Sequence, residues 1–235
     1  MCRFNWQLCI FLLVLAATSS AVAAKCVEHA KLRDQESLFK QGWKLIEEQG
    51  ETRIYNREVR GSSVHEVLVN AILDAPPWRV FAVISDYDRF REFMPYTEQS
   101  KTLRIEGSSR WVFQRLKFPF WFVSDRYYTI KLTDQVMGLG NQLYCVDWIK
   151  AEEQESERSG PGEIPAINDG FWLLRSVKGG AQTDVTYFVH TDPGGLIPAL
   201  ITNTANKKAL PAVIQAVRDR VENKDYDRFD PARGP

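Results

Sequence analysis

The sequence is poor in the residues that most often carry acid–base and metal chemistry. It has only three histidines, His29, His65 and His190, and four cysteines. No paired Cys or His spacing predicts a metal site, and it has no nucleophile elbow, phosphate-binding loop or zinc-protease motif. Basic and acidic residues balance at 30 each, which argues against non-specific nucleic-acid binding. We therefore expect no catalytic centre, no metal or other cofactor, and no nucleic-acid partner.

Long apolar runs are also lacking, because the stretch from Leu8 to Ala17 falls well short of the ~20 residues that a membrane-spanning helix needs. Arg3 precedes this stretch and small residues follow it, which is the pattern of a secretory signal. We predict a signal peptide over residues 1–24, cleaved after Ala23 or Ala24, and a periplasmic location for the protein. An uncleaved membrane anchor is the alternative.

Only Cys26 and Cys145 remain once the predicted signal has taken Cys2 and Cys9 away. In an oxidising compartment these two residues could form a single disulfide. Cys145 also falls within a predicted strand, where a cysteine often serves as a small buried hydrophobic residue. The sequence leaves both roles open, because pairing depends on the distance and direction of the two side chains in the fold.

Hydrophobic periodicity divides the rest of the chain into helical and extended segments. A helix is predicted from Asp34 to Gln49, within an N-terminal helical region over residues 25–50. A short helix follows Pro76-Pro77, and a long one runs from Gly195 to about Asn223. The polar tail, 224–235, is expected to be flexible. Strands with a period of two are predicted at Thr52–Val59, Ser63–Leu73, Thr97–Glu106, Arg110–Leu116, Asp125–Asp134, Gln142–Lys150, Ile167–Ser176 and Gln182–Thr191.

This order of elements predicts one α+β domain over residues 51–223, with an antiparallel sheet covered by helices on one face. Alternation along most strands indicates which side chains point toward that buried face. On the strand from Arg110 to Leu116 the alternation is ambiguous, because Trp111 and Phe113 share one parity while Val112 and Leu116 share the other.

Three segments resemble the START (StAR-related lipid-transfer) family of the helix-grip superfamily. The most specific is Thr183–Tyr187 with Asp192-Pro193-Gly194-Gly195, which is similar to the family's last strand, its glycine-containing turn and the start of its long helix. Ser124–Tyr128 and Gly170-x-Trp172-x-Leu174 are also similar, and the resemblance extends from Thr52 to Val221. It implies a helix-grip fold, in which a curved antiparallel sheet wraps around a long C-terminal helix and encloses a cavity for a lipid or other apolar ligand.

One departure from the family narrows the ligand. Some sterol-binding members carry an inward basic residue six positions along the strand that begins here at Arg126, and this position is Leu132. A sterol therefore loses support. Arg126 itself either forms a structural ion pair, with Asp86 or Asp125 as its partner, or holds a ligand head group near the cavity mouth. The candidate ligand-binding residues are Trp111, Phe113, Arg126, Tyr128, Tyr144, Trp148, Trp172, Tyr187, Ile197 and Ile201.

We expect the protein to bind, and to transfer or sequester, a lipid or other hydrophobic small molecule without chemistry. The apolar loop Phe118–Val123 is either a transient membrane contact or a plug of the core. Two alternatives belong to other classes of protein. One is a cyclase- or hydrolase-like enzyme of the same superfamily, and the other is a periplasmic protein–protein adaptor that docks through this loop. The sequence does not indicate the oligomeric state.

Overall fold

A computed structural model describes residues 25–62, 64–118, 124–137, 143–151, 162–192 and 199–230, with the backbone alone for 199–208. Several predictions lie outside these residues. They concern the signal peptide over residues 1–24, most of the Phe118–Val123 loop, Ile197, and the side chain of Ile201.

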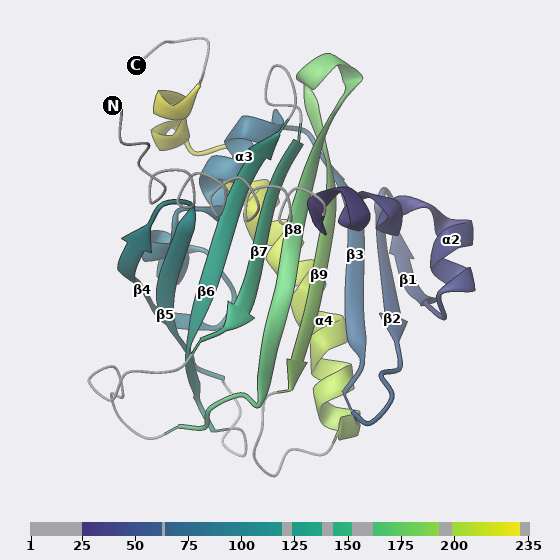
Figure 1. Ribbon diagram of the computed structural model, residues 1–235. Helices are drawn as coiled ribbons and strands as arrows, with labels where there is room; N and C mark the ends of the chain where they lie inside the picture. The colour runs from purple at the N-terminus through teal and green to yellow at the C-terminus, as the bar shows by residue number, and fades with distance from the viewer. Residues whose placement is uncertain are drawn as a thin grey trace, which may run out of the picture.

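Within the described residues, nine strands form one antiparallel sheet in the order β1-β2-β3-β9-β8-β7-β6-β5-β4 (Figure 1). The pairing of β3 with β9 joins the first three strands to the last six and sets Val67 opposite Val189. The first three strands of the chain therefore lie beside its last strand, β9. The strands are β1 (Lys44–Gln49), β2 (Thr52–Arg57), β3 (Glu66–Leu73), β4 (Thr97–Glu106), β5 (Ser109–Leu116), β6 (Arg126–Met137), β7 (Leu143–Lys150), β8 (Ile167–Val177) and β9 (Gln182–Asp192).

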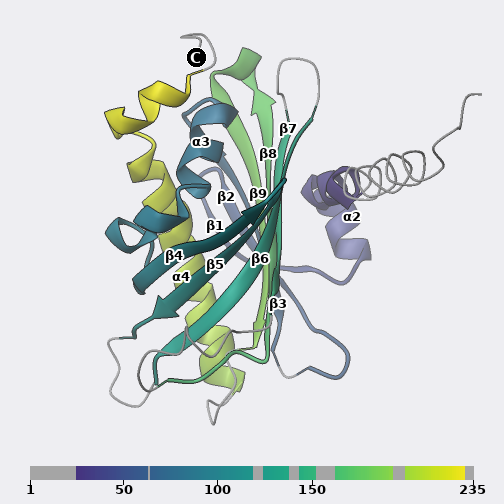
Figure 2. The ribbon, with the colours of Figure 1, turned by 60° about the vertical axis from the view of Figure 1, so that its left-hand side comes forward.

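Two helices cover one face of this sheet, which we call the helix face (Figure 2). The first, α3 (Pro77–Ile84), starts with a proline, whose missing N–H costs no hydrogen bond in the first turn, and it buries Val80. The second, α4 (Ala199–Arg220), runs across the sheet and buries Ile214 and Val217. The predicted α+β helix-grip fold is confirmed. No helix in the described part of the chain is long and apolar enough to cross a membrane.

The prediction of a single helix over residues 34–49 is wrong beyond its first turns. The helix α2 (Gln35–Lys40) is capped by the Asp34 side chain and ends before Gly42, which has a positive φ of 84°. The chain then enters β1 and pairs with β2. A β-bulge interrupts β1, so this segment lacks the regular alternation by which a strand is recognised in a sequence.

The prediction of a flexible tail from residue 224 is also wrong for its first part. Residues Lys224–Phe229 form a short 3-10 helix, in which Tyr226 is fully buried and donates its O–H to Asp86 at 2.9 Å. Arg79 of α3 lies 2.6 Å from Asp227. These contacts attach the segment to α3, and no periodicity within so short a segment would reveal them.

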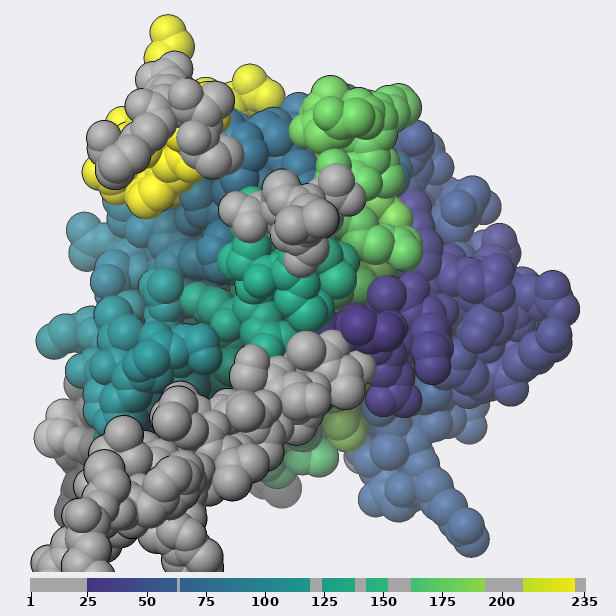
Figure 3. All heavy atoms as spheres, turned by 45° about the horizontal axis from the view of Figure 1, so that its top comes forward, coloured from purple at the N-terminus to yellow at the C-terminus, as the bar shows by residue number. Residues whose placement is uncertain are grey.

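The opposite face of the sheet, which we call the outer face, carries the N-terminal strap, residues 25–33 (Figure 2). Figure 3 shows these purple residues against the green strands. Cys26 forms a disulfide with Cys145 of β7, with the two Cα atoms 6.1 Å apart. Lys25 Nζ and His29 Nε2 both lie within 2.9 Å of one oxygen of Asp147. Of the two roles that the sequence left open for the cysteines, the structure shows pairing.

Candidate functional site

The helix face carries a row of aromatic rings contributed by β7, β8 and β9. The rings of Trp172 and Tyr187 are stacked with their centroids 4.0 Å apart, and Trp148 lies 6.0 Å from Tyr187. Trp148 and Trp172 are each 7% exposed, while Tyr187 is half-buried. All three residues are among the candidate ligand-binding residues predicted from the sequence, and the structure brings them together.

Gly170 makes room for this row. A Cβ atom built on Gly170 would lie 2.1 Å from Cζ2 of Trp148 and 2.4 Å from the backbone oxygen of Phe188, which is far inside van der Waals contact. The indole of Trp148 therefore lies over the backbone of β8 at a position where only glycine fits. This close approach explains why the Gly170-x-Trp172 motif on this strand begins with glycine.

Buried polar side chains lie on the same face and bond to one another. Tyr128 O–H donates to Gln114 Oε1 at 3.0 Å, and Trp148 Nε1–H donates to Asn168 Oδ1 at 3.2 Å. Burial raises the pKa of Tyr128 to about 12, so its hydroxyl stays protonated and available as a donor at neutral pH. Sequence reasoning missed Gln114 and Asn168. Asn168 shares the parity of Trp172, and that alternation could have identified it.

Arg126 lies at the start of β6 on this face and is 2% exposed. Its Nη1 donates to the backbone oxygens of Ser124 at 2.5 Å and of Asp125 at 3.2 Å. Burial lowers the pKa of Arg126, while the charges of Glu163 and Asp125 oppose that shift. Of its two predicted partners, Asp125 is close. The other, Asp86, accepts a hydrogen bond from the hydroxyl of Tyr226.

On β5, whose alternation in the sequence is ambiguous, the structure places two predicted site residues on the face away from the helices. Val112 is fully buried in the core beneath the helices, so Trp111 and Phe113 face the other side of the sheet. There the Arg104 guanidinium lies 3.8 Å above the Trp111 ring, and the Lys131 ammonium lies 5.0 Å from it. Long cationic side chains can cover an exposed indole in this way, and this is why an outward tryptophan resembles an inward one in the sequence.

The other end of the helix face packs against α3 and borders a hollow of about 350 Å³, which Tyr144, Phe81 and Trp78 help to line. Tyr144, another predicted site residue, packs its ring 4.9 Å from that of Phe81 on α3. Leu132 is 3% exposed within this core, so the absence of a charge at its position agrees with its surroundings. Beside it, burial raises the pKa of Asp134, although Arg110 at 3.1 Å opposes the shift. The aromatic row and the polar groups thus lie toward the start of β6 and β8.

Two histidine–aspartate pairs lie on the outer face of the sheet. His29 contacts Asp147 there, and His190 of β9 is opposite Asp169 of β8. Both aspartates project from the outer face of the sheet. Neither pair can reach a molecule held on the helix face, because the sheet lies between them.

Comparison with known proteins agrees with this geometry. The sequence matches the family described as polyketide cyclase / dehydrase and lipid transport over residues 73–218. Uncharacterized protein PA1579 of Pseudomonas aeruginosa is 26% identical over 183 residues, which span 77% of this chain and 88% of that protein.

Two solved structures share the fold. The STAR-related lipid transfer protein of Xanthomonas axonopodis is 25% identical and has a TM-score of 0.67, covering 77% of this chain and 99% of that one. Human StAR-related lipid transfer protein 5 is 15% identical and has a TM-score of 0.73, covering 88% of this chain and 96% of that one. The chain described here therefore belongs to the polyketide cyclase / dehydrase and lipid transport family, within the START-like helix-grip superfamily.

Proposed function

We propose that the protein binds a lipid or other hydrophobic small molecule between the helix face and α4, and that it transfers or sequesters this molecule without chemistry. The observation that carries the proposal is the aromatic row of Trp148, Trp172 and Tyr187 beside the bonded polar groups. Apolar walls with a few fixed polar groups are the usual composition of a site that binds and orients an apolar ligand. The similarity to the lipid transfer protein of Xanthomonas axonopodis supports the same ligand class.

The polar groups fit a ligand with one uncharged hydrogen-bonding group. Tyr128, Gln114 and Asn168 are neutral donors and acceptors, and a ligand hydroxyl or carbonyl can exchange hydrogen bonds with them. The Arg126 side chain already donates to backbone oxygens. An anionic head group that bound Nη1 would have to compete with those hydrogen bonds.

The proposed place of action is the periplasm. The disulfide between Cys26 and Cys145 supports an oxidising compartment, because such bonds persist mainly outside the cytoplasm. Removal of the predicted signal over residues 1–24 would leave Cys26 close to the start of the mature chain.

A membrane contact is proposed for the edge of the molecule near Phe118. Tyr96 is 40% exposed and packs its ring 5.3 Å from the ring of Phe118, so two aromatic residues meet at the surface there. Aromatic rings with one polar end suit the boundary between water and lipid.

Mass spectrometry of an organic extract from the purified protein tests the proposal. We expect a stoichiometric lipid or other apolar compound, and the Trp172→Ala variant should retain much less of it. A folded protein that yields no such compound, and that takes up none from phospholipid vesicles, would contradict the proposal.

An enzyme acting on a hydrophobic substrate is the second candidate, because the family's description includes cyclases and dehydrases. The group on the helix face that favours this reading is Tyr128, a buried phenol held by Gln114, which stays protonated and can donate a hydrogen bond to a substrate oxygen. Change of an extracted compound on incubation with the protein, lost in Tyr128→Phe, would support the enzyme. Unchanged compound would favour carriage alone.

A further inference from the structure

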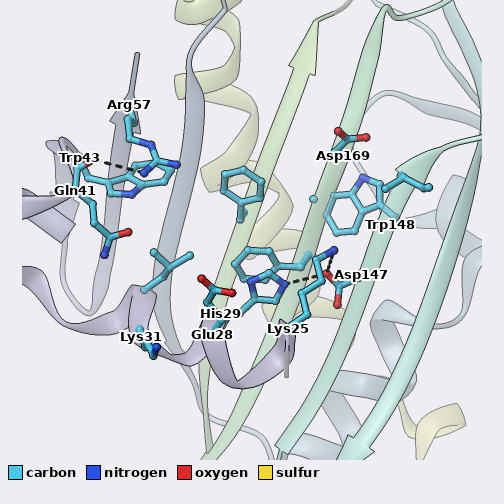
Figure 4. A pocket seen from close by; sticks show the side chains of 15 residues that line it. Lys25, Glu28, His29, Lys31, Gln41, Trp43, Arg57, Asp147, Trp148 and Asp169 are labelled. Atoms are coloured by element: carbon cyan, nitrogen blue, oxygen red, sulfur yellow. Dashed lines mark hydrogen bonds and ion pairs between the residues drawn. The ribbon is translucent and has the colours of Figure 1, made fainter. Parts of the chain in front are cut away.

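A separate hollow lies on the outer face, on the other side of the sheet from the proposed lipid site. Its volume is about 570 Å³, and it is bounded by the N-terminal strap, by Trp43 and by β7 to β9 (Figure 4). This volume falls within the range of roughly 300–1,000 Å³ that is common for small-molecule sites. We call this hollow the outer slot.

Two nearly parallel phenylalanine rings form the floor of the outer slot, and an indole perpendicular to them closes one end. The rings of Phe171 and Phe188 lie nearly parallel, at 17°, with their centroids 5.3 Å apart. The indole of Trp43 meets Phe188 edge-on, at 83° and 6.2 Å. Leu32 of the strap adds an apolar side. Such a floor and wall match the thickness and edge of one planar ring system better than a branched or flexible chain.

One planar ring already occupies half of this floor. The imidazole of His29 stacks on Phe171 at 3.6 Å and 8°, and Phe171 is accordingly 3% exposed. Phe188, on the next strand, is half-buried, and the described residues place no such stacked ring on it. The protein itself thus shows how a planar group binds here, and it leaves the neighbouring position to a ligand.

The rim of the outer slot has charges of both signs. Lys25 and Asp147 are paired with each other, and Arg57 is bound to Glu66 at 2.7 Å. Lys31 also lines the slot, and the acidic rim residues Glu28 and Asp169 counterbalance it. Three cationic and three anionic side chains line the slot, so it has no net charge to attract a ligand of either sign and favours an uncharged compound.

Asp169 supplies a polar anchor for such a compound. Its Oδ1 accepts a long hydrogen bond of 3.4 Å from the Lys150 backbone N–H. Figure 4 shows Asp169 across the opening from Trp43. A carboxylate oxygen at that position can accept a hydrogen bond from a hydroxyl or N–H group on the ligand.

We propose that the outer slot binds a small, uncharged, planar aromatic compound that carries a hydrogen-bond donor. The ring stacks on Phe188 beside His29, with its edge toward Trp43, and the donor reaches Asp169. This site is separate from the proposed lipid site, because Phe171, Phe188 and Asp169 project from the opposite side of the sheet and only Trp148 and Gly170 border both.

Calorimetric titration of the full mature, oxidised protein with 2-naphthol tests the proposal. We expect saturable binding of one molecule per chain, and a shift of the Trp43 indole N–H signal in the nuclear magnetic resonance spectrum. Phe188→Leu keeps an apolar side chain of similar size but removes the flat ring, and it should weaken binding by about tenfold. Asp169→Asn should weaken it by about threefold, since it replaces a charged acceptor with a neutral one.

Two controls separate this site from other modes of binding. Phe39→Leu makes the same chemical change at an exposed phenylalanine of α2 and should leave the affinity unchanged. Trp172→Leu alters the proposed lipid site and should also leave it unchanged. The proposal is overturned if 2-naphthol shows no saturable binding in the millimolar range, if Phe188→Leu and Asp169→Asn bind it as tightly as the unmodified protein, or if only Trp172→Leu weakens binding.

Discussion

The two faces of the sheet are stabilised by different means. On the helix face, apolar side chains of α3 and α4 belong to one large buried cluster with Leu174, Val185 and the residues of the aromatic row. On the outer face a smaller apolar cluster around Leu38 and Leu173 is covered by a short strap held by one disulfide and three ion pairs. A long helix can cover a face by burying apolar area alone, whereas a segment of nine residues needs covalent and charged contacts to stay in place.

The comparison predicts that breaking the disulfide will have the largest effect and that it will be confined to the outer face. The Cys26→Ser, Cys145→Ser double variant should lose about 4 kcal/mol of unfolding free energy, because the bond closes a long loop. Urea unfolding measures this loss. Lipid retention by the remaining folded protein should be unchanged, and a parallel loss of lipid would show that the two faces are not independent.

A methyl group at Gly170 should disturb the helix face almost as strongly. We expect Gly170→Ala to cost about 3 kcal/mol, because the new Cβ would overlap the Trp148 ring and the Phe188 backbone. Gly107→Ala is the matched control, since Gly107 has a positive φ but open space around it. It should cost only about 1 kcal/mol, from backbone strain. Equal losses in the two variants would contradict the account of Gly170.

The charged contacts of the strap predict a loss of stability in acid, whereas Asp134 on the helix face, whose pKa burial raises, contributes in the opposite direction. Burial opposes ionisation of Asp147, but hydrogen bonds from His29 and Lys25 outweigh it and lower the pKa of this carboxyl in the folded protein. Its contribution to stability is therefore complete above the unfolded pKa, and it is lost as the pH falls through the folded value.

Asp147→Asn should lower the unfolding free energy at pH 7 by about 2 kcal/mol and flatten its dependence on pH in the acid range. Stability measured across that range in both proteins checks this expectation. If the unfolding free energy has the same pH slope in the variant and in the unmodified protein, then a group other than Asp147 causes the acid sensitivity.

The smallest expected effect concerns the polar groups of the helix face. Tyr128→Phe removes the hydroxyl that donates to Gln114 and should cost about 1 kcal/mol of stability. We also expect severalfold weaker retention of the extracted ligand, because one neutral donor is lost. If stability falls while ligand retention does not change, then Tyr128 supports the core and does not contact the ligand.

Most of the sheet could be predicted from the sequence because its strands alternate and are separated by glycine-bearing turns. The predicted bounds of β4 are those observed, and those of β8 and β9 differ by one residue at one end. β1 could not be predicted, since its bulge shifts the side chains from one face to the other. Tyr226 was missed for another reason. Its burial depends on Asp86, which lies far away in sequence and close in space.

The candidate site was predictable only in part. Trp148, Trp172 and Tyr187 follow from parity, because the inward residue two positions away on each strand (Val146, Leu174 and Val185) is apolar. Trp111 could not be assigned, since its outward position depends on cations from β4 and β6 that cover it. Asn168 was missed because a single polar residue in an apolar alternation is easily taken for an outward one. The outer slot depends on the position of the strap, which periodicity cannot give.

The disulfide also has a consequence for the order in which the molecule assembles. Cys26 and Cys145 are separated by 119 positions, so the first thiol leaves the ribosome long before its partner exists. Bringing the two sulfurs together at random over such a loop is slow and entropically unfavourable. Pairing of β7 into the sheet brings Cys145 beside the strap, and we expect oxidation to follow that step. We expect the disulfide to form late, when most of the sheet has already paired.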